Sequence, residues 1–385
     1  CRPGAARSRA AGEVGGCPRG AARHGAAEAA SHCRRYRLSP RGDRPRGRVG
    51  HGCLFLPPGP GPGPGRVLLL GGADPAGAFA DAHFVELGAL RWAPAGWTGL
   101  RPRYEHATFL AAAAPPRLWV FGGADPAGNR SCVQVLDPET GSWESPVVSG
   151  EPPLPRTFHT STAAIGARLY VFGGGEKGAE PVRDQRLHVF DTGTLSWSQP
   201  ATRGDPPSPR HGHVVAAVGT KLFVHGGLAG DTFYSDLFCL DTNDMRWVKV
   251  SATGDVPGAR ASHSSAVFRD HVYIFGGIGL EGTLDTTYKY HTEQQQWTLL
   301  QFDCPLPAGR LDQAMCVIPW HVGESQEAAA APSMSEARAG GDQAAPLQNS
   351  PEQGSDAAVV HLLLVFGGMN MQGEMYADCL VTLLE

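Results

Sequence analysis

Three histidines beside a glycine pair are the most chemistry-like feature of this sequence. His211, His213 and His225 lie in the stretch PSPRHGHVVAAVGTKLFVHGG, which ends on Gly226 and Gly227. Closely spaced imidazoles can bind a metal ion, and paired glycines can form a loop around a phosphate group. No aspartate or glutamate stands beside these histidines to complete a ligand set, so the spacing alone does not define a metal site.

A second candidate is the pattern Gly-x-Gly-x-x-Gly at Gly277, Gly279 and Gly282. Dinucleotide binding requires a helix directly after such a pattern, because the helix N-terminus holds the pyrophosphate. The residues that follow, TLDTTYKYHTEQQQW, predict a strand, a turn and a strand instead. The nine cysteines contain no Cys-x-x-Cys pair, so no zinc knuckle or redox motif is encoded. We therefore expect no catalytic residue, no cofactor and no metal ion.

Both glycine patterns belong to an internal repeat of about 50 residues. In six units, an Arg-x-x-His motif (Arg-x-x-Gln in the last) precedes an apolar run that ends in two glycines, and a tryptophan follows in five of them. The arginines are Arg48, Arg103, Arg156, Arg210, Arg260 and Arg310. The glycine pairs are Gly71 and Gly72, Gly122 and Gly123, Gly173 and Gly174, Gly226 and Gly227, Gly276 and Gly277, and Gly367 and Gly368. The tryptophans are Trp92, Trp143, Trp197, Trp247 and Trp297.

Each unit divides into about four short strands separated by turns. In the unit from Arg210 to Trp247 these strands are HVVAAV, KLFVHGG, SDLFCLD and MRWVKV. Four strands per unit, repeated along the chain, is typical of a β-propeller. The glycine pair and the later tryptophan resemble the kelch repeat over residues 48–385. That resemblance implies an all-β fold, a six-bladed propeller with four antiparallel strands in each blade.

The last unit ends on its third strand, CLVTLLE, and would leave a sheet edge open. The motif Gly42-Asp43-x-Pro45-x-x-Arg48 repeats the residues that follow the fourth strand in later units. By this alignment, residues 35–39 supply the missing fourth strand and close the ring. Arg35 stands where the other units have tryptophan, so we expect the last blade to be the weakest.

Residues 1–48 hold twelve arginines against Glu13, Glu28 and Asp43, although the whole chain has a net charge of −4. We interpret 1–34 as a disordered Arg/Ala/Gly-rich segment or a gene-model artefact, not as a nucleic-acid-binding arm. Residues 35–385 form the propeller, with a disordered insertion over about 321–357 in the last blade. This insertion and the shorter ones at Pro57–Gly65 and Ala111–Pro116 all separate first and second strands, so they should leave the same side of the ring. No apolar run is long enough to span a membrane.

The repeat favours structural roles for the chemistry-like residues. His213 occupies the same place as His51, His106, His159 and His263, which indicates packing in each blade and not one catalytic centre. The six repeated arginines are the candidate partner-binding ring. The alternative is that they pair with blade carboxylates such as Asp81, Asp184, Asp236, Asp285 or Asp378, and this alternative is favoured because the arginine recurs in every blade.

A closer resemblance is to kelch propellers that act as Rab effectors. It is carried by RYEHATF, VFGGADPAGNR, LPRTFHTSTAAIGARLYVFGGGEKGAEPV, FVHGGLAGD and VFGGMNMQGEMYADC. It implies a monomeric, non-enzymatic interaction scaffold that binds a GTP-loaded late-endosomal Rab GTPase in transport from endosomes to the trans-Golgi network. The chain would be cytoplasmic and would reach these membranes only through the Rab. The alternatives are a kelch metalloenzyme using copper or iron, and a scaffold for another partner such as an acidic peptide.

Overall fold

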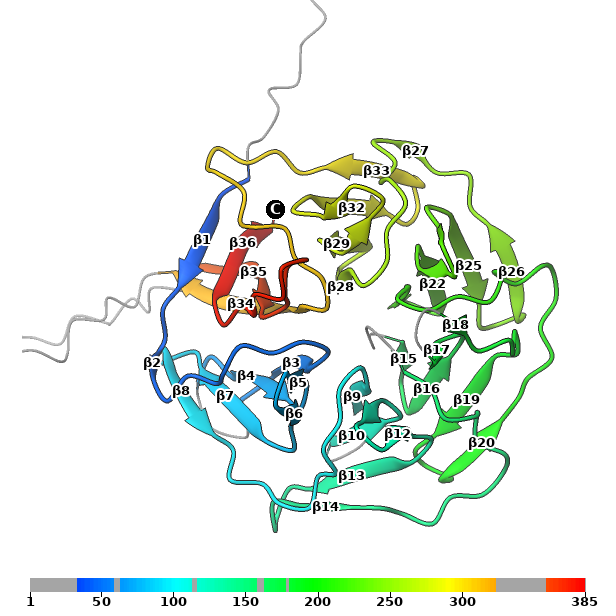
Figure 1. The fold of residues 1–385 in the computed structure, drawn as a ribbon, viewed down its shortest axis with the longest axis horizontal. Helices are drawn as coiled ribbons and strands as arrows, with labels where there is room; N and C mark the ends of the chain where they lie inside the picture. The colour runs from blue at the N-terminus through cyan, green and yellow to red at the C-terminus, as the bar shows by residue number, and fades with distance from the viewer. Residues whose placement is uncertain are drawn as a thin grey trace, which may run out of the picture. The chain divides into compact units, whose positions relative to one another are not determined.

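The computed structural model describes residues 33–58, 63–112, 116–157, 163–177, 180–322 and 358–384. Contacts divide the chain into two units, Cys1–Ser31 and His32–Glu385. In the second unit, six β-sheets are arranged around a central axis as the blades of a propeller (Figure 1). The described residues contain strands and no helix. The six-bladed all-β prediction is therefore confirmed.

Each blade has four antiparallel strands. The strand that follows the Arg-x-x-His motif lies nearest the axis (Figure 1). From the inside outward, blade 1 contains β3 (Gly52–Leu56), β4 (Arg66–Leu70), β7 (Ala82–Glu86) and β8 (Arg91–Pro94). Blade 2 contains β9 (Ala107–Ala111), β10 (Arg117–Phe121), β13 (Val133–Asp137) and β14 (Ser142–Glu144). Blade 3 contains β15 (Ala164–Ile165), β16 (Arg168–Val171), β19 (His188–Asp191) and β20 (Ser196–Ser198). Blades 4 and 5 contain β21 (Val214–Val218), β22 (Lys221–His225), β25 (Leu237–Asp241) and β26 (Arg246–Lys249); and β28 (Ser264–Phe268), β29 (His271–Phe275), β32 (Thr287–His291) and β33 (Gln296–Leu299). Blade 6 contains β34 (Ala314–Val322), β35 (Ala358–Phe366), β36 (Cys379–Leu384) and β1 (Arg35–Leu38).

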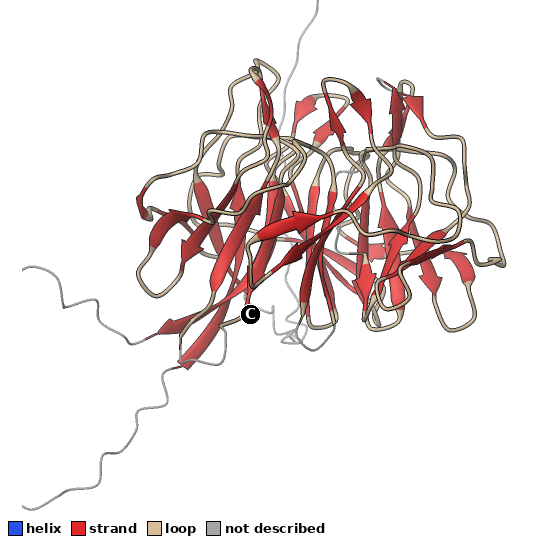
Figure 2. Cartoon of the chain, turned by 90° about the horizontal axis from the view of Figure 1, so that it is seen from below, coloured by secondary structure: helices blue, strands red, loops and turns tan. Residues whose placement is uncertain are grey.

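The remaining strands are two or three residues long. Two of them, β2 (Arg41–Gly42) and β27 (Thr253–Gly254), add a short parallel edge to blades 1 and 5. The others form hairpins after the glycine pairs: β5 and β6 (Ala73–Asp74, Gly77–Ala78), β11 and β12 (Ala124–Asp125, Gly128–Asn129), β17 and β18 (Gly175–Lys177, Glu180–Pro181), β23 and β24 (Leu228–Ala229, Thr232–Phe233), and β30 and β31 (Ile278–Gly279, Gly282–Thr283). Figure 2 shows the blades edge-on between two faces of connections. We call the side with these hairpins the hairpin face, and the side where first strands join second strands the turn face.

The glycine pairs lie at the ends of the second strands, beside backbone atoms of the next blade. Gly226 and Gly227 have φ angles of +67° and +97°, which a side chain would strain. A Cβ on Gly226 would also lie 2.6 Å from the carbonyl oxygen of Arg260 in the next blade. Glycine is therefore required here by both conformation and space. The pattern at Gly277, Gly279 and Gly282 is part of the β30–β31 hairpin and is followed by strand β32, so it has no nucleotide-binding geometry.

The core consists of six apolar clusters, and each cluster is formed by two adjacent blades. The repeated tryptophans supply much of this contact. Trp92 of blade 1 contacts Phe366 of blade 6 at 5.5 Å between ring centroids, and Trp247 of blade 4 contacts Phe172 of blade 3 at 5.1 Å. Because neither face of a blade is covered by its own strands, its stability depends on both neighbours.

Blade 6 is closed by β1, which pairs antiparallel with β36 over four residues. This confirms that an N-terminal strand completes the last blade. Arg35 takes the place of the tryptophan: its guanidinium lies 5.0 Å from the Phe275 ring of blade 5 and donates to the hydroxyls of Thr382 (3.0 Å) and Thr287 (2.7 Å). Desolvation by burial lowers the pKa of Arg35 to about 10.

Two predicted disordered segments fall largely outside the described residues. Of residues 1–34, the structure describes only the last two, and of the insertion predicted over about 321–357 it describes only the first two, which belong to β34. Among the described residues there is no helix with the length and hydrophobicity of a membrane span.

Candidate partner-binding surfaces

The six repeated arginines are buried, each at most 2% exposed. In every blade Nη1 donates to the carbonyl oxygen of the first glycine of that blade's pair, at 2.8–3.1 Å. Nε donates to the carbonyl two residues earlier, at 2.9–3.3 Å. Each guanidinium thus joins the loop that enters a blade to the end of its second strand.

The outer nitrogens of these arginines bind a residue that differs between blades. In four blades it is an aspartate: Asp81 with Arg48, Asp184 with Arg156, Asp236 with Arg210, and Asp378 with Arg310. These are pairings that the repeat predicted. Arg103 instead donates to the side-chain oxygen of Gln134 at 2.7 Å, and Arg260 lies 3.4 Å from the Thr286 hydroxyl and not on Asp285.

Burial and charge pairing both influence ionisation in this ring. Burial lowers the pKa of Arg103, Arg156 and Arg260 from the ordinary arginine value. Although burial alone would raise it, hydrogen bonds from His83 and Arg48 hold the pKa of Asp81 well below its usual range. The full set of contacts favours a structural role over partner binding. The partner-binding ring stays a prediction, which would require these side chains to act from beneath the surface.

The repeated histidines connect neighbouring blades. His213 in blade 4 bonds the Phe172 carbonyl of blade 3 at 3.0 Å, and Gln313 in blade 6 donates to the Phe275 carbonyl of blade 5 at 2.7 Å. His225, where four other units have phenylalanine, packs on Trp297 and bonds His263 through its Nδ1 at 3.1 Å. His159 lies outside the described residues. His213 and His225 therefore make separate contacts between blades, and the described residues show no metal-ligand cluster that joins the opening histidines.

Burial keeps the imidazoles of His51, His106 and His225 neutral. Desolvation lowers the pKa of His51 and of His225 to about 3, and it lowers the pKa of His106 well below the ordinary value. A neutral imidazole can both donate and accept one hydrogen bond, which suits the bond from His225 to His263 between blades 4 and 5. Trp92, Trp143, Trp197 and Trp247 are likewise buried between blades.

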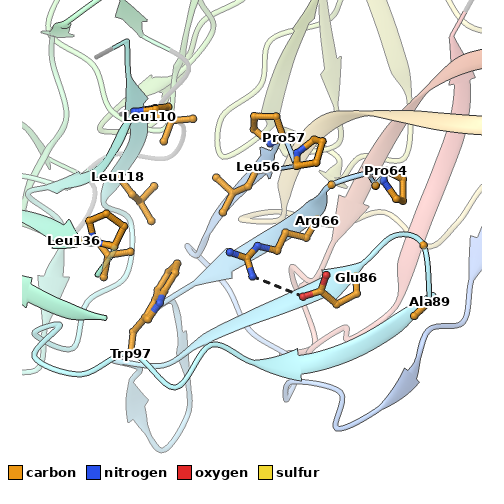
Figure 3. Close-up of a pocket in the computed structure, with 16 residues that line it drawn as sticks. Leu56, Pro57, Pro64, Arg66, Glu86, Ala89, Trp97, Leu110, Leu118 and Leu136 are labelled. Atoms are coloured by element: carbon orange, nitrogen blue, oxygen red, sulfur yellow. Dashed lines mark ion pairs between the residues drawn. The ribbon is translucent and has the colours of Figure 1, made fainter. Parts of the chain in front are cut away.

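An apolar pocket of about 1100 Å³ opens between blades 1 and 2 on the turn face. Figure 3 shows Leu110, Leu118 and Leu136 on the blade 2 side, opposite Leu56 and the Arg66–Glu86 ion pair of blade 1. In this pair Arg66 Nη1 lies 3.8 Å from Glu86 Oε1, and both side chains are 43% exposed. Such a pocket can take an apolar side chain of a partner and bind a polar group at its charged edge.

Sequence reasoning did not find this pocket, because its walls come from two blades far apart in sequence. One signal pointed toward it. The insertions at Pro57–Gly65 and Ala111–Pro116 were expected on the same side of the ring, and their described ends, including Pro57, Pro64 and Pro116, line this one pocket.

Sequence reasoning also missed a cluster on blade 5. Asp270, His271 and His291 each offer a potential ligand atom, and these atoms lie within 4.8 Å of one another. The two histidines are separated in sequence and meet only because β29 pairs with β32. The sequence did contain one signal for this cluster. His271 and His291 stand at positions where other units have oppositely charged residues that form an ion pair.

Comparison with known proteins agrees with this architecture. Residues 63–277 and 117–322 match the family model described as the KLHDC2/KLHL20/DRC7 Kelch-repeats domain. A chicken protein named Rab9 effector protein with kelch motifs is 74% identical over 355 residues, covering 91% of this chain and 95% of that protein. Human and zebrafish proteins of the same name are 59% and 53% identical, with the same two coverages. Repeat geometry, family model and near full-length similarity agree: the chain belongs to the kelch-repeat family, in the group of Rab9 effector proteins with kelch motifs.

Proposed function

We propose that this chain is a protein-interaction scaffold that acts as an effector of a Rab GTPase. The observation that carries the proposal is its 74% identity, over 91% of its length, to a protein named Rab9 effector protein with kelch motifs. A closed ring of six blades supports a binding role, since it fixes many loops on two rigid faces. Catalysis is not part of the proposal, because similarity to an effector family gives no reason to assign a reaction.

The partner is a late-endosomal Rab in its GTP-bound state. The γ-phosphate and its magnesium ion order the switch segments of a GTPase, and these segments loosen after hydrolysis. A rigid surface that fits the ordered switches binds the GTP form more tightly, and that difference in affinity is what makes a protein an effector. The effector acts in transport from endosomes to the trans-Golgi network.

Membrane recruitment occurs through the Rab. The chain is cytoplasmic, acts as a monomer and associates peripherally with endosomal and trans-Golgi membranes. Liposomes without Rab should therefore capture none of the purified protein, whereas liposomes that carry lipid-anchored, GTP-loaded Rab should capture it. Capture by bare liposomes would contradict this mode of recruitment.

The deciding experiment compares nucleotide states. The full chain is titrated with purified Rab9 loaded either with a non-hydrolysable GTP analogue or with GDP, and binding is measured by calorimetry. Tighter binding to the GTP-analogue form supports the proposal, and an early-endosomal Rab in both states controls for specificity. Equal affinity for the two nucleotide states, or no binding to either, would overturn the effector function and leave a kelch scaffold with another partner.

A further inference from the structure

The turn face of blade 5 carries a compact group of two histidines and one aspartate. His271, the first residue of β29, pairs directly with His291, the last residue of β32, and the ring centroids are 4.6 Å apart. Asp270, in the turn before β29, lies between them. Its Oδ1 is 2.7 Å from His271 Nδ1, and its Oδ2 is 3.4 Å from His291 Nε2.

The same cross-strand place holds a base and an acid in other blades. The register pairs are Arg66 with Glu86 in blade 1, Arg168 with Asp191 in blade 3, and Lys221 with Asp241 in blade 4. In blade 3 this pair forms an ion pair at 3.0 Å. Blade 5 replaces both charged residues with imidazoles and adds a carboxylate from the turn, which converts an ion-pair position into a set of three donor atoms.

The backbone fixes the aspartate beside the second histidine. The Asp270 carbonyl accepts hydrogen bonds from the amide (3.0 Å) and the hydroxyl (2.8 Å) of Thr292, the residue after His291. Blade 4 has the same two bonds from Thr242 to Thr220, so the arrangement is a standard part of the repeat. The backbone of Asp270 is therefore fixed beside His291 before any ligand binds, which reduces the ordering that binding requires.

We propose that Asp270, His271 and His291 form a binding site for a zinc ion. Two imidazoles and a carboxylate are a ligand set that zinc takes with tetrahedral geometry, leaving a fourth position for water or for a side chain of a partner. The three donor atoms lie within 4.8 Å of one another, so one ion can reach all of them. The three side chains are 20–42% exposed, and the two histidines border a cavity of about 240 Å³, which gives the ion a path from solvent.

Two neighbours set the strength of this site. The backbone N–H of Gln294 donates a long hydrogen bond of 3.4 Å to His291 Nδ1. Zinc bound at Nε2 would require the ring proton to be on Nδ1, and this proton would displace the bond from Gln294. Lys289 lines the same cavity, and its ammonium group opposes a second cation. Lys289→Gln should therefore tighten zinc binding.

The test is a calorimetric titration of the tag-free, metal-depleted full chain with zinc, with magnesium as the control cation. We expect one zinc site and no magnesium binding. The matched variant is His271→Lys with His291→Asp, which recreates the Lys221–Asp241 pair of blade 4 and should fold normally. Zinc affinity should fall at least 10-fold in this variant and in Asp270→Asn.

Both variants retain every cysteine, so zinc held by thiols would remain bound in them. No zinc uptake by the wild-type chain would overturn the proposal, as would the same affinity in the double variant as in wild type. Zinc binding and Rab binding are measured separately. Loss of zinc with normal Rab affinity would leave the effector function intact, and normal zinc binding with no Rab affinity would do the reverse.

Discussion

At the scale of single residues, the repeated arginines donate hydrogen bonds to the glycine that follows the second strand of each blade. Arg210 reaches the Gly226 carbonyl at 3.0 Å and the two oxygens of Asp236 at 2.5 and 3.3 Å. Only a planar fork of donors can make these bonds at once. Arg260 makes the same backbone bond but has Thr286 in place of a carboxylate, at 3.4 Å. The two residues therefore allow the charged contact to be measured separately.

Arg210→Lys should lower the free energy of unfolding by about 2 kcal/mol, since lysine cannot bind Asp236 and Gly226 together. Arg260→Lys should cost less, because its outer partner is an uncharged hydroxyl. Urea denaturation of both variants measures the difference, and equal losses of unfolding free energy would contradict it.

The Rab affinity of folded Arg260→Lys also tests the partner-binding ring. A variant that loses Rab affinity but keeps its free energy of unfolding would favour a direct contact between this arginine and the Rab.

His225 should make the protein sensitive to acid. Burial lowers its pKa to about 3 in the folded chain, whereas an unfolded histidine titrates near 6.5. The unfolded state therefore binds more protons below pH 6.5, and the stability that the neutral residue contributes is lost as pH falls from 6.5 toward 3. By pH 5 this loss is about 2 kcal/mol.

The matched variant is His225→Phe, because Phe121, Phe172, Phe275 and Phe366 occupy this position in other units. The fall in unfolding free energy between pH 7 and pH 5 should be about 2 kcal/mol smaller in this variant than in wild type. Denaturation at the two pH values provides the measurement. An unchanged pH dependence would mean that His225 is not buried in its neutral form.

At the scale of elements, strand β1 decides whether the last blade is complete. It covers the outer edge of β36 and places Arg35 against Phe275 of the neighbouring blade. The side chains of β1 differ in burial along the strand. Arg35 is largely buried, whereas the Arg37 side chain is 69% exposed and forms an ion pair with Asp378 at 3.4 Å. One strand thus offers two arginines whose removal should change stability by very different amounts.

Arg35→Ala should lower the free energy of unfolding by about 2 kcal/mol, because it removes the stacking on Phe275 and leaves two threonine hydroxyls without their donor. Arg37→Ala should change it by less than about 0.5 kcal/mol, since exposed ion pairs contribute little. Thermal and urea denaturation of both variants would test this contrast. Similar effects at the two positions would show that β1 does not pack against blade 5 as described.

At the scale of the whole molecule, every blade is stabilised by both of its neighbours through the six shared apolar clusters. Blade 6 differs in two respects: its fourth strand comes from the opposite end of the sequence, and it has arginine where the other blades have the packing tryptophan. We therefore expect the ring to open first at the β1–β36 contact.

Native-state hydrogen exchange should show this order of opening. The amides that pair β1 with β36 should exchange faster than those that pair β22 with β25 in blade 4, because local opening follows the local density of packing. Mass spectrometry of peptides from the two regions provides the measurement. Equal protection throughout would instead indicate that the ring opens only by complete unfolding.

The repeat made much of the fold predictable. Glycine pairs, tryptophans and Arg-x-x-His motifs kept the same spacing in unit after unit, and that regularity predicts blade number, strand order and the closing role of residues 35–39. The same regularity indicated that His213 has a structural role, because a residue needed in every blade answers a requirement of the backbone. These inferences depend on local geometry, which the sequence repeats together with its residues.

What the sequence by itself determined is therefore the six-bladed ring, its closure, and a family of binding scaffolds. Only the tertiary structure decided that the arginines are buried at their glycine carbonyls, and that Leu118 and Arg66 share one pocket. Only the structure brought His271 and His291 beside Asp270. Contacts across strands and between blades join residues whose separation in sequence carries no signal, so their chemistry emerges when the sheets pair and the ring closes.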